Sequence, residues 1–265
     1  MDPALGLQLS AGIAAFGSGL SSLEHLAKIK EFGVGGVCSP LLHLESRFGR
    51  GKLGAFLQCT DLVVAMLSIR LIAAIAVLLA DLFWPAKAPI AFLWILVFSS
   101  AWVAWRRRVG GDGGEQMTNI VLIASSVGLT FSLTPSVQRA AAIFIAMQSC
   151  LAYFAAGMAK LLSRIWRSGD AVRSIVNTHT HGSQGLVALL TKYSRLSRIL
   201  NWGLIGAELA FPTVLLVPKG ICIALLGLGL FFHLSNAVVM GLNNFVWAFL
   251  ATYPCIYFLR DAIRG

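Results

Sequence analysis

The sequence predicts an all-α membrane protein, a polytopic transmembrane helical bundle of about 7–8 membrane helices. The 265 residues are 57% hydrophobic and only 12% charged, whereas a soluble domain usually carries about 25% charged residues. The apolar residues also form runs long enough to cross a bilayer, which takes roughly 20 residues of helix. The alternating pattern of a β-barrel is absent. The chain is therefore expected to be integral to a membrane.

Seven apolar segments are predicted to span the membrane, separated by polar or glycine-rich connections. They are 61–84, 89–105, 117–134, 137–162, 200–217, 221–240 and 244–259. Residues 4–20 are apolar but rich in Gly and Ser, so they form either an eighth span or an interfacial helix. This pattern divides the chain into an N-terminal membrane or interfacial segment with a loop, residues 1–60, and a transmembrane bundle, residues 61–265.

The net charge of +10 reflects basic residues that lie mostly between the apolar runs. When these residues are assigned to alternating sides of the predicted spans, thirteen fall on one side and five on the other. The side with more Lys and Arg is predicted to be cytoplasmic. A basic face with base-stacking aromatic residues is not evident, so the predicted partner is the lipid bilayer and not a nucleic acid.

Two short motifs contain residues that could bind a ligand. His179 and His181 lie two residues apart without a third ligand nearby, which favours a loop over a metal site. The five cysteines form no CxxC pair, so no metal is expected from them either. The segment "GGDGGEQM", residues 110–117, lacks the lysine of a phosphate-binding loop. It predicts a helix N-terminus at which Asp112 and Glu115 complement the helix dipole.

Polar side chains inside the predicted spans are the candidate functional residues, because such groups are costly in lipid. They are Arg70, Gln148, Lys160, Glu208, His233 and Asn236. Arg70 is expected to pair with Asp61 or with an acid on another helix. Glu208 is expected to be protonated or paired, and both a structural and a functional role stay open. His233 and Asn236 share one helix face, which either lines a polar cavity or joins neighbouring helices.

Lys160 lies in "YFAAGMAKLLSRIWRSGD", where an apolar run ends. Tyr153, seven residues earlier, lies on the same helix face. One interpretation is an anchor whose ammonium group reaches the membrane surface. The other is a general base, because partial burial would lower the pKa of a lysine. Periodicity and charge alone favour the anchor.

The same segment resembles the vitamin K-dependent γ-glutamyl carboxylases, which carry an aromatic pair, "AG", a lysine, a tryptophan and a glycine in this order. "FFHLSNAVVMGLNNFVWAFLATYPCIYF" resembles their later pair of membrane helices, with matches at His233, Asn236, Phe245 and Pro254. "GGDGGEQM" is similar to a loop of their bacterial relatives. Over roughly residues 100–260, the chain is identified as a member of the horizontally transferred transmembrane (HTTM) domain family.

The resemblance implies a carboxylase-like lyase or a peptide-maturation enzyme with a reduced, vitamin K-like quinone as its cofactor. Lys160 matches the family's general base, and His233 is the second candidate catalytic residue. The expected cavity or substrate residues are Asn236, Glu208, Arg70, Tyr153 and Gln148. Two features depart from the family: Ala159 stands where the carboxylases have a second lysine, and their large lumenal domain is not found here.

The chain is closer in size to small bacterial HTTM proteins, including component B of the sporulation-delaying toxin system. This likeness implies a bacterial inner membrane protein that matures a secreted peptide together with a small partner protein. γ-Carboxylation itself is the first alternative, and a non-enzymatic transporter, immunity protein or scaffold is the second. One conflict remains: the charge bias places the Lys160 end on the cytoplasmic side, whereas the carboxylases act on the lumenal side.

Overall fold

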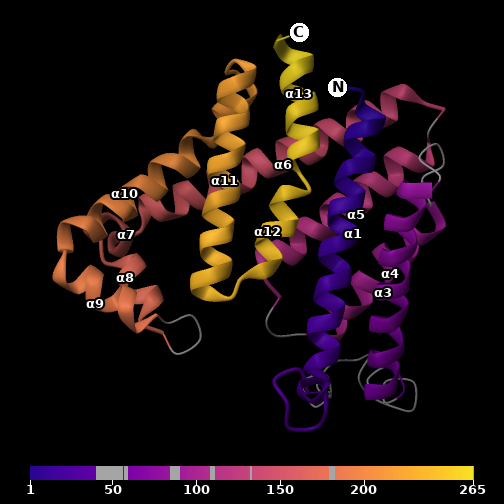
Figure 1. The fold of residues 1–265 in the computed structure, drawn as a ribbon, viewed down its shortest axis with the longest axis horizontal. Helices are drawn as coiled ribbons and strands as arrows, with labels where there is room; N and C mark the ends of the chain where they lie inside the picture. The colour runs from indigo at the N-terminus through magenta and orange to yellow at the C-terminus, as the bar shows by residue number, and fades with distance from the viewer. Residues whose placement is uncertain are drawn as a thin grey trace.

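The computed structural model describes residues 1–39, 56, 59–83, 90–107, 111–131, 133–178 and 183–264, and these residues form helices and no strands (Figure 1). The α-helices are α1 Pro3–Ala27, α3 Thr60–Phe83, α4 Ile90–Arg106, α5 Gly113–Thr130, α6 Pro135–Leu162, α7 Arg164–Ser168, α8 Ala171–Val176, α9 Gln184–Lys192, α10 Ser194–Ala210, α11 Lys219–Met240, α12 Asn243–Leu250 and α13 Tyr253–Arg264. Two short 3₁₀ helices, η1 Ile29–Phe32 and η3 Phe211–Leu215, follow α1 and α10. The predicted all-α class is confirmed.

Four helices in the described ranges are long and apolar enough to cross a membrane by length and composition. They are α1, residues 60–80 of α3, α6 and α11. The 17-residue α4 is apolar but shorter. A bundle of 7–8 spans is therefore not confirmed.

Helix α1 packs against α3, α5, α6, α12 and α13. Its buried face carries mainly Gly, Ala and Ser, which let neighbouring backbones approach closely. A Cβ atom at Gly17 would lie only 2.6 Å from the Cβ of Trp247 on α12. Residues of α1 share one apolar core with the later helices. The division at residue 60 stays a prediction, although α1 packs as part of the bundle.

Two predicted spans are interrupted in the structure. The expectation of one helix over 244–259 is wrong, because α12 ends at Leu250 and α13 begins at Tyr253. Residues 200–217 likewise divide into α10 and η3. Each break lies just before a proline, Pro254 or Pro212, which lacks the N–H of a continuous helix and clashes with the preceding turn.

The break between α12 and α13 is held by a side chain. The Thr252 hydroxyl lies 2.7 Å from the carbonyl oxygen of Phe249 and 2.9 Å from the hydroxyl oxygen of Ser149 on α6. These contacts satisfy polar groups that the helix end would otherwise leave unpaired. The interruption therefore also ties the C-terminal helices to α6.

The two ends of α1 lie on opposite sides of the molecule, because α1 runs across its long axis (Figure 1). At one end, the Met1 amino group lies 3.3 Å from Asp261, and Arg260 donates to the carbonyl oxygen of Val217, just before α11 (Figure 1). At the other end, His25 contacts Arg107. A helix of 25 residues is about 37 Å long. Arg107 and Arg260 thus lie far apart, as the predicted alternation of charges requires.

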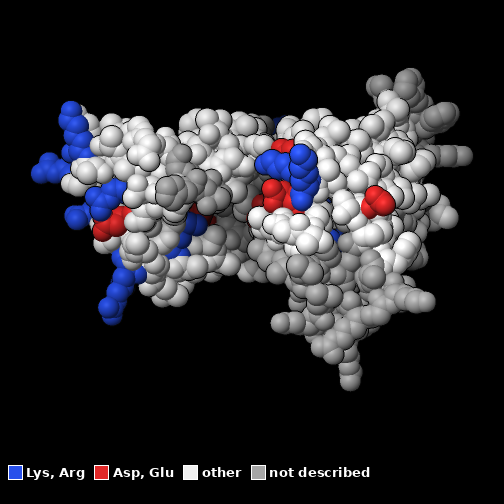
Figure 2. Space-filling model, turned by 90° about the horizontal axis from the view of Figure 1, so that it is seen from below, with Lys and Arg blue, Asp and Glu red and all other residues white. Residues whose placement is uncertain are grey.

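Helices α7–α10 form a basic projection at one end of the molecule, where Lys and Arg side chains gather (Figure 2). Its exposed cations are Arg164, Arg167, Lys192, Arg195 and Arg198. The projection turns at Gly169, whose φ of 91° favours glycine. The carbonyl oxygen of Gly169 accepts hydrogen bonds from Ser197 and Asn201 of α10.

The charge bias makes a prediction about topology. A cysteine at Arg195, in the basic projection, is expected to react with a membrane-impermeant maleimide only after cells are lysed. A cysteine at Leu133, which is 96% exposed near the start of α6, is expected to react in intact cells. Protein without an added cysteine but with Cys59 replaced by serine provides the background, because Cys59 is half-buried and the other four cysteines are buried. The opposite labelling pattern would reverse the predicted orientation.

Candidate active site

A cavity of about 160 Å³ lies between α6, α10, η3 and α11, and is called here the α6–α10–α11 cavity. Its walls are mostly Leu, Ala and Phe side chains, and its polar lining side chains are Tyr153, Glu208 and Thr213. Ligand pockets are usually larger, at about 300–1,000 Å³. The cavity is therefore sized for one ring or one short side chain.

A close helix crossing brings charged residues to this cavity. A Cβ atom at Gly157 of α6 would lie 2.9 Å from the backbone nitrogen of Leu209 and 3.1 Å from the Cβ of Glu208, both on α10. Only glycine lets the two backbones approach so closely. Lys160 lies one helical turn after Gly157 and therefore reaches Glu208.

Lys160 and Glu208 form an ion pair between α6 and α10. The Nζ atom of Lys160 donates to both carboxylate oxygens, at 2.6 and 2.8 Å. The side chains are only 19% and 7% exposed, respectively, and Nζ also lies 5.1 Å from the centre of the Trp166 ring. Lys160 thus pairs within the protein rather than reaching outward as the anchor interpretation required.

Tyr153 and His233 form a second polar pair, between α6 and α11. The Tyr153 hydroxyl lies 2.6 Å from Nε2 of His233, which is only 3% exposed. Tyr153 stacks on Phe211 and His233 stacks on Phe249, with ring centroids 3.7 and 4.3 Å apart. The Nδ1 atom of His233 has no hydrogen-bond partner within the described ranges. A proton there would be an unsatisfied buried donor, so we infer that Nε2 carries the proton and the Tyr153 oxygen accepts it.

The two pairs meet at the same cavity. Glu208 and Tyr153 line it, whereas Lys160 and His233 lie behind them and contact it through these partners. Lys160 and His233, which are 73 positions apart in the sequence, therefore each contact a residue that lines the same cavity. Sequence periodicity alone does not reveal this arrangement, because it depends on how three helices cross.

Asn236 and Gln148 are not brought to this cavity. Both side chains are part-buried, and neither makes a side-chain hydrogen bond to another described residue. Asn236 does follow His233 by one turn of α11, as predicted, but only its backbone oxygen is used, as an acceptor near the helix end. Neither residue lines the α6–α10–α11 cavity or the second cavity described next.

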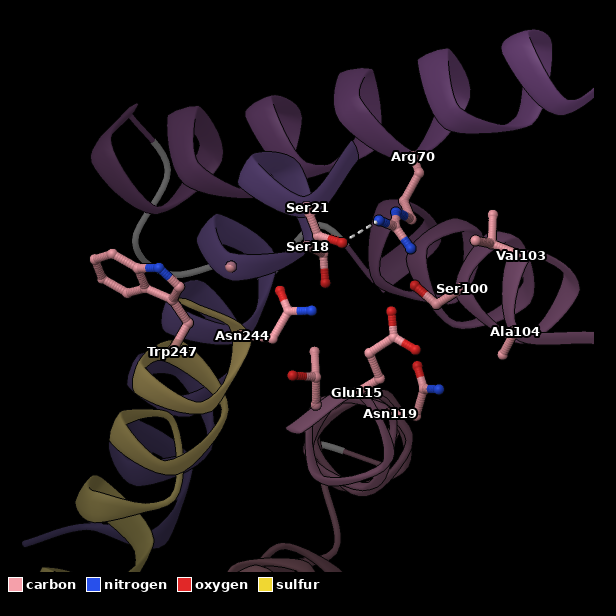
Figure 3. Close-up of a pocket in the computed structure, with 12 residues that line it drawn as sticks. Ser18, Ser21, Arg70, Ser100, Val103, Ala104, Glu115, Asn119, Asn244 and Trp247 are labelled. Atoms are coloured by element: carbon pink, nitrogen blue, oxygen red, sulfur yellow. Dashed lines mark hydrogen bonds between the residues drawn. The ribbon is translucent and has the colours of Figure 1, made fainter. Parts of the chain in front are cut away.

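Arg70 lies away from the other candidates, in a second cavity of about 30 Å³ called here the Arg70 cavity (Figure 3). The prediction that Arg70 pairs with Asp61 or another acid is wrong: its Nε and Nη2 atoms donate to the hydroxyls of Ser22 and Ser21, at 2.7 and 3.0 Å. Asp61 is nine residues earlier on α3, which places it on the opposite helix face. Arg70 is only 5% exposed.

A polar network beside the Arg70 cavity was missed by the sequence search. Arg107 forms an ion pair with Glu115 and also contacts Nε2 of His25 at 2.7 Å. Since arginine can only donate, Nε2 accepts, and the His25 proton lies on Nδ1, which donates to the Ser21 carbonyl oxygen at 2.6 Å. His25 is therefore neutral. These residues lie at helix ends, outside the segments that were searched for intramembrane charges.

The predicted helix N-terminus at "GGDGGEQM" is confirmed. Helix α5 begins at Gly113, and the Asp112 carboxylate accepts a hydrogen bond from the backbone N–H of Glu115 at 2.8 Å. Burial raises the pKa of Asp112, and the nearby Arg107 guanidinium opposes this effect. In the described ranges, no group of three or more His, Cys, Asp or Glu residues could hold a metal ion. His179 and His181 lie outside these ranges.

Comparison with known proteins gives one match. Residues 131–261 match the family model of the HTTM domain. This range includes both polar pairs of the α6–α10–α11 cavity, while the Arg70 cavity is formed mainly by residues that precede it. No curated protein and no solved structure matches the chain.

Proposed function

The chain is an HTTM-domain integral membrane protein, and from this premise we propose that it is an enzyme acting on an apolar substrate in the α6–α10–α11 cavity. The observation that carries the proposal is the placement of two titratable pairs on one small apolar cavity. Lys160 and Glu208 meet it from one side, and Tyr153 and His233 from another. A few polar groups that converge on an apolar cavity are typical of ligand-binding and catalytic sites.

The Lys160–Glu208 pair is the proposed base. In the ionised pair Lys160 already carries a proton, so it accepts another only after passing one to Glu208. The 2.6 Å contact between Nζ and Oε2 permits this transfer, and burial favours the neutral form of a pair by penalising its charges. In that form the pair takes a proton from the substrate through Glu208, which lines the cavity, as Glu208 returns its own proton to the Lys160 amine and restores the ammonium.

The residues present fit the ring of a reduced quinone, the cofactor that the family resemblance implies. Phe211 and Phe232 offer aromatic surface, while Glu208 and Tyr153 offer polar groups. The cavity admits a ring but not a long tail, and Leu228 beside it is 64% exposed, as expected for a residue that faces lipid. When bound, such a group supplies an acidic hydroxyl proton. The chain's own residues would orient the ring and remove that proton.

The proposed final substrate is a secreted peptide, matured together with a small partner protein at a bacterial inner membrane. This part of the proposal rests on the resemblance to small bacterial HTTM proteins. γ-Carboxylation of the peptide is the specific form of the reaction that the carboxylase resemblance favours.

A non-enzymatic role is the second candidate function, and one observation favours it. Both polar pairs join α6 to another helix, α10 or α11, which is what residues that only hold a bundle together would do. The α6–α10–α11 cavity, which lies between the two pairs, favours the enzymatic role over the non-enzymatic one.

The test compares lysine variants in a producing strain. Lys160→Met is expected to lower the rate of maturation of a co-expressed secreted peptide about 100-fold or more, because general bases contribute factors of this size. Lys219→Met, which removes a lysine of the same domain outside the cavity, is expected to have no effect. The peptide is analysed by mass spectrometry, with and without added quinol and bicarbonate, in strains with equal membrane levels of the protein.

The outcomes separate the candidate functions. A mass gain of one CO2 that depends on quinol and on Lys160 identifies γ-carboxylation. Another modification that depends on Lys160 identifies a different maturation reaction. Full peptide maturation by the Lys160→Met protein would contradict the enzymatic proposal and favour the non-enzymatic role.

A further inference from the structure

The Arg70 cavity is separate from the proposed active site and is lined mainly by polar groups. Figure 3 shows the Arg70 guanidinium entering it from α3, opposite the Glu115 carboxylate of α5, with Ser100 of α4 and Asn244 beside them. Such a collection of hydrogen-bonding groups around a small space requires either water or a polar ligand.

Arg70 brings a positive charge to this space. A guanidinium group does not lose its proton in proteins, and no carboxylate of the described residues lies within ion-pair distance of Arg70. Serine hydroxyls satisfy two of its nitrogens, Nε and Nη2. The third nitrogen, Nη1, makes no hydrogen bond to a described residue. Hydroxyl groups solvate a buried cation but do not neutralise it.

The carboxylate that lines the cavity does not cancel this charge. Glu115 is paired with Arg107, which the Ser21–His25 contacts link to Arg70. His25 is neutral, and Glu115 forms its ion pair with Arg107 and not with Arg70, so the charge of Arg70 has no direct partner among the described residues. The other nearby acid, Asp112, lies close to Arg107, caps α5 and does not line the cavity.

Ser100 supplies an independent sign of a missing ligand. Its side chain is 5% exposed and lines the cavity, yet its hydroxyl has no hydrogen-bond partner in the described ranges. Buried hydroxyl groups are normally paired. A ligand that accepts hydrogen bonds would satisfy Ser100 and the free nitrogen of Arg70 together.

We propose that the Arg70 cavity binds a small monovalent anion. About 30 Å³ holds roughly two water-sized centres, which suits chloride, formate or bicarbonate and excludes larger organic acids. The anion accepts hydrogen bonds from Arg70 and Ser100 and supplies the missing negative charge. It thereby joins α4 to α3 and, through the serine contacts of Arg70, to α1, and stabilises the N-terminal half of the bundle.

The experiment measures thermal unfolding of the purified full-length protein in detergent, at constant ionic strength, as sodium gluconate is replaced by chloride, formate or bicarbonate. The midpoint is expected to rise and saturate with the small anions, because a ligand of the folded state stabilises it. Ser100→Ala is expected to weaken the apparent affinity about tenfold, by removing one hydrogen bond to a charged group. Arg70→Gln is expected to abolish the dependence.

A matched control distinguishes anion binding from general packing. Ser125 of α5 is also fully buried with an unpartnered hydroxyl, but it does not line the cavity. Ser125→Ala is expected to keep the anion dependence of the unaltered protein, and so is Lys160→Met, whose site is elsewhere.

Two results would overturn the proposal. One is an unfolding midpoint that is the same in gluconate and in every small anion, as expected for a cavity that holds only water. The other is an unchanged anion affinity in Ser100→Ala, a variant that loses only an unpaired hydroxyl and whose folding is therefore not in question. Both results leave the proposed function of the α6–α10–α11 cavity untouched.

Discussion

Replacing Lys160 by methionine is expected to lower the free energy of unfolding by about 3 kcal/mol, in addition to its effect on function. The change leaves the Glu208 carboxylate, whose side chain is 7% exposed, without its partner, and breaking a buried pair in this way is strongly destabilising. Denaturation of the purified protein in detergent, followed by tryptophan fluorescence, measures the difference.

The double variant Lys160→Met/Glu208→Leu is the control for this prediction. It removes both charges and fills the space with apolar side chains, so most of the lost stability is expected to return. It also gives a stable protein without the pair, in which loss of function is not a result of unfolding. A double variant no more stable than Lys160→Met would show that the pair does not account for the loss.

Replacing Gly157 by alanine is expected to destabilise the protein by about 1–3 kcal/mol, the usual cost of an overpacked contact. The new methyl group would lie 2.9 Å from the backbone nitrogen of Leu209, so α6 and α10 would have to move apart. This movement would also separate Lys160 from Glu208, and peptide maturation is expected to fall with stability. The measurements are the unfolding midpoint and the maturation assay.

Gly206→Ala is the matched control, because it makes the same chemical change on α10. A Cβ atom at Gly206 would contact nothing within 4 Å. Alanine has a higher helix propensity than glycine, by about 1 kcal/mol, so this variant is expected to be as stable as the unaltered protein or more so. If both substitutions shifted the unfolding midpoint in the same direction by the same amount, the close crossing at Gly157 would not be the cause.

The fold class could be predicted from composition, but the number of spans could not. Residues 200–217 and 244–259 are apolar enough to be predicted as spans. A hydropathy average does not take account of Pro212 and Pro254, which interrupt the helices. The proline effect is local and physical, so the breaks could have been predicted by giving these two residues more weight.

The members of the candidate site could be predicted better than their partners. Lys160, Glu208 and His233 stood out as polar residues in apolar segments, and Tyr153 through the carboxylase resemblance. Their pairing could not be derived, because it depends on the crossing at Gly157, and contact between α6 and α10 joins positions 48 apart in the sequence. Whether these residues act as catalysts stays a prediction.

The partners of Arg70 were missed for a different reason. Ser21 and Ser22 follow the predicted N-terminal segment, residues 4–20, and did not stand out in the sequence, although in the structure their hydroxyls bind the guanidinium. A serine on a buried helix face lowers hydropathy and also offers a hydrogen bond. The hydrogen bond can be predicted only when the helix that packs against the serine is known.

The break between α12 and α13 also bears on how the chain enters the bilayer during synthesis. At 1.5 Å per residue the two helices are about 12 and 18 Å long, and each is shorter than the hydrocarbon core of about 30 Å. Neither can be inserted stably by its own hydropathy. Both helices are made after α1 and pack against it, at Gly17, which receives Trp247, and at the Met1 amino group, which meets Asp261. We therefore expect α12 and α13 to enter the bilayer by docking onto the already inserted α1 and not by their own hydropathy.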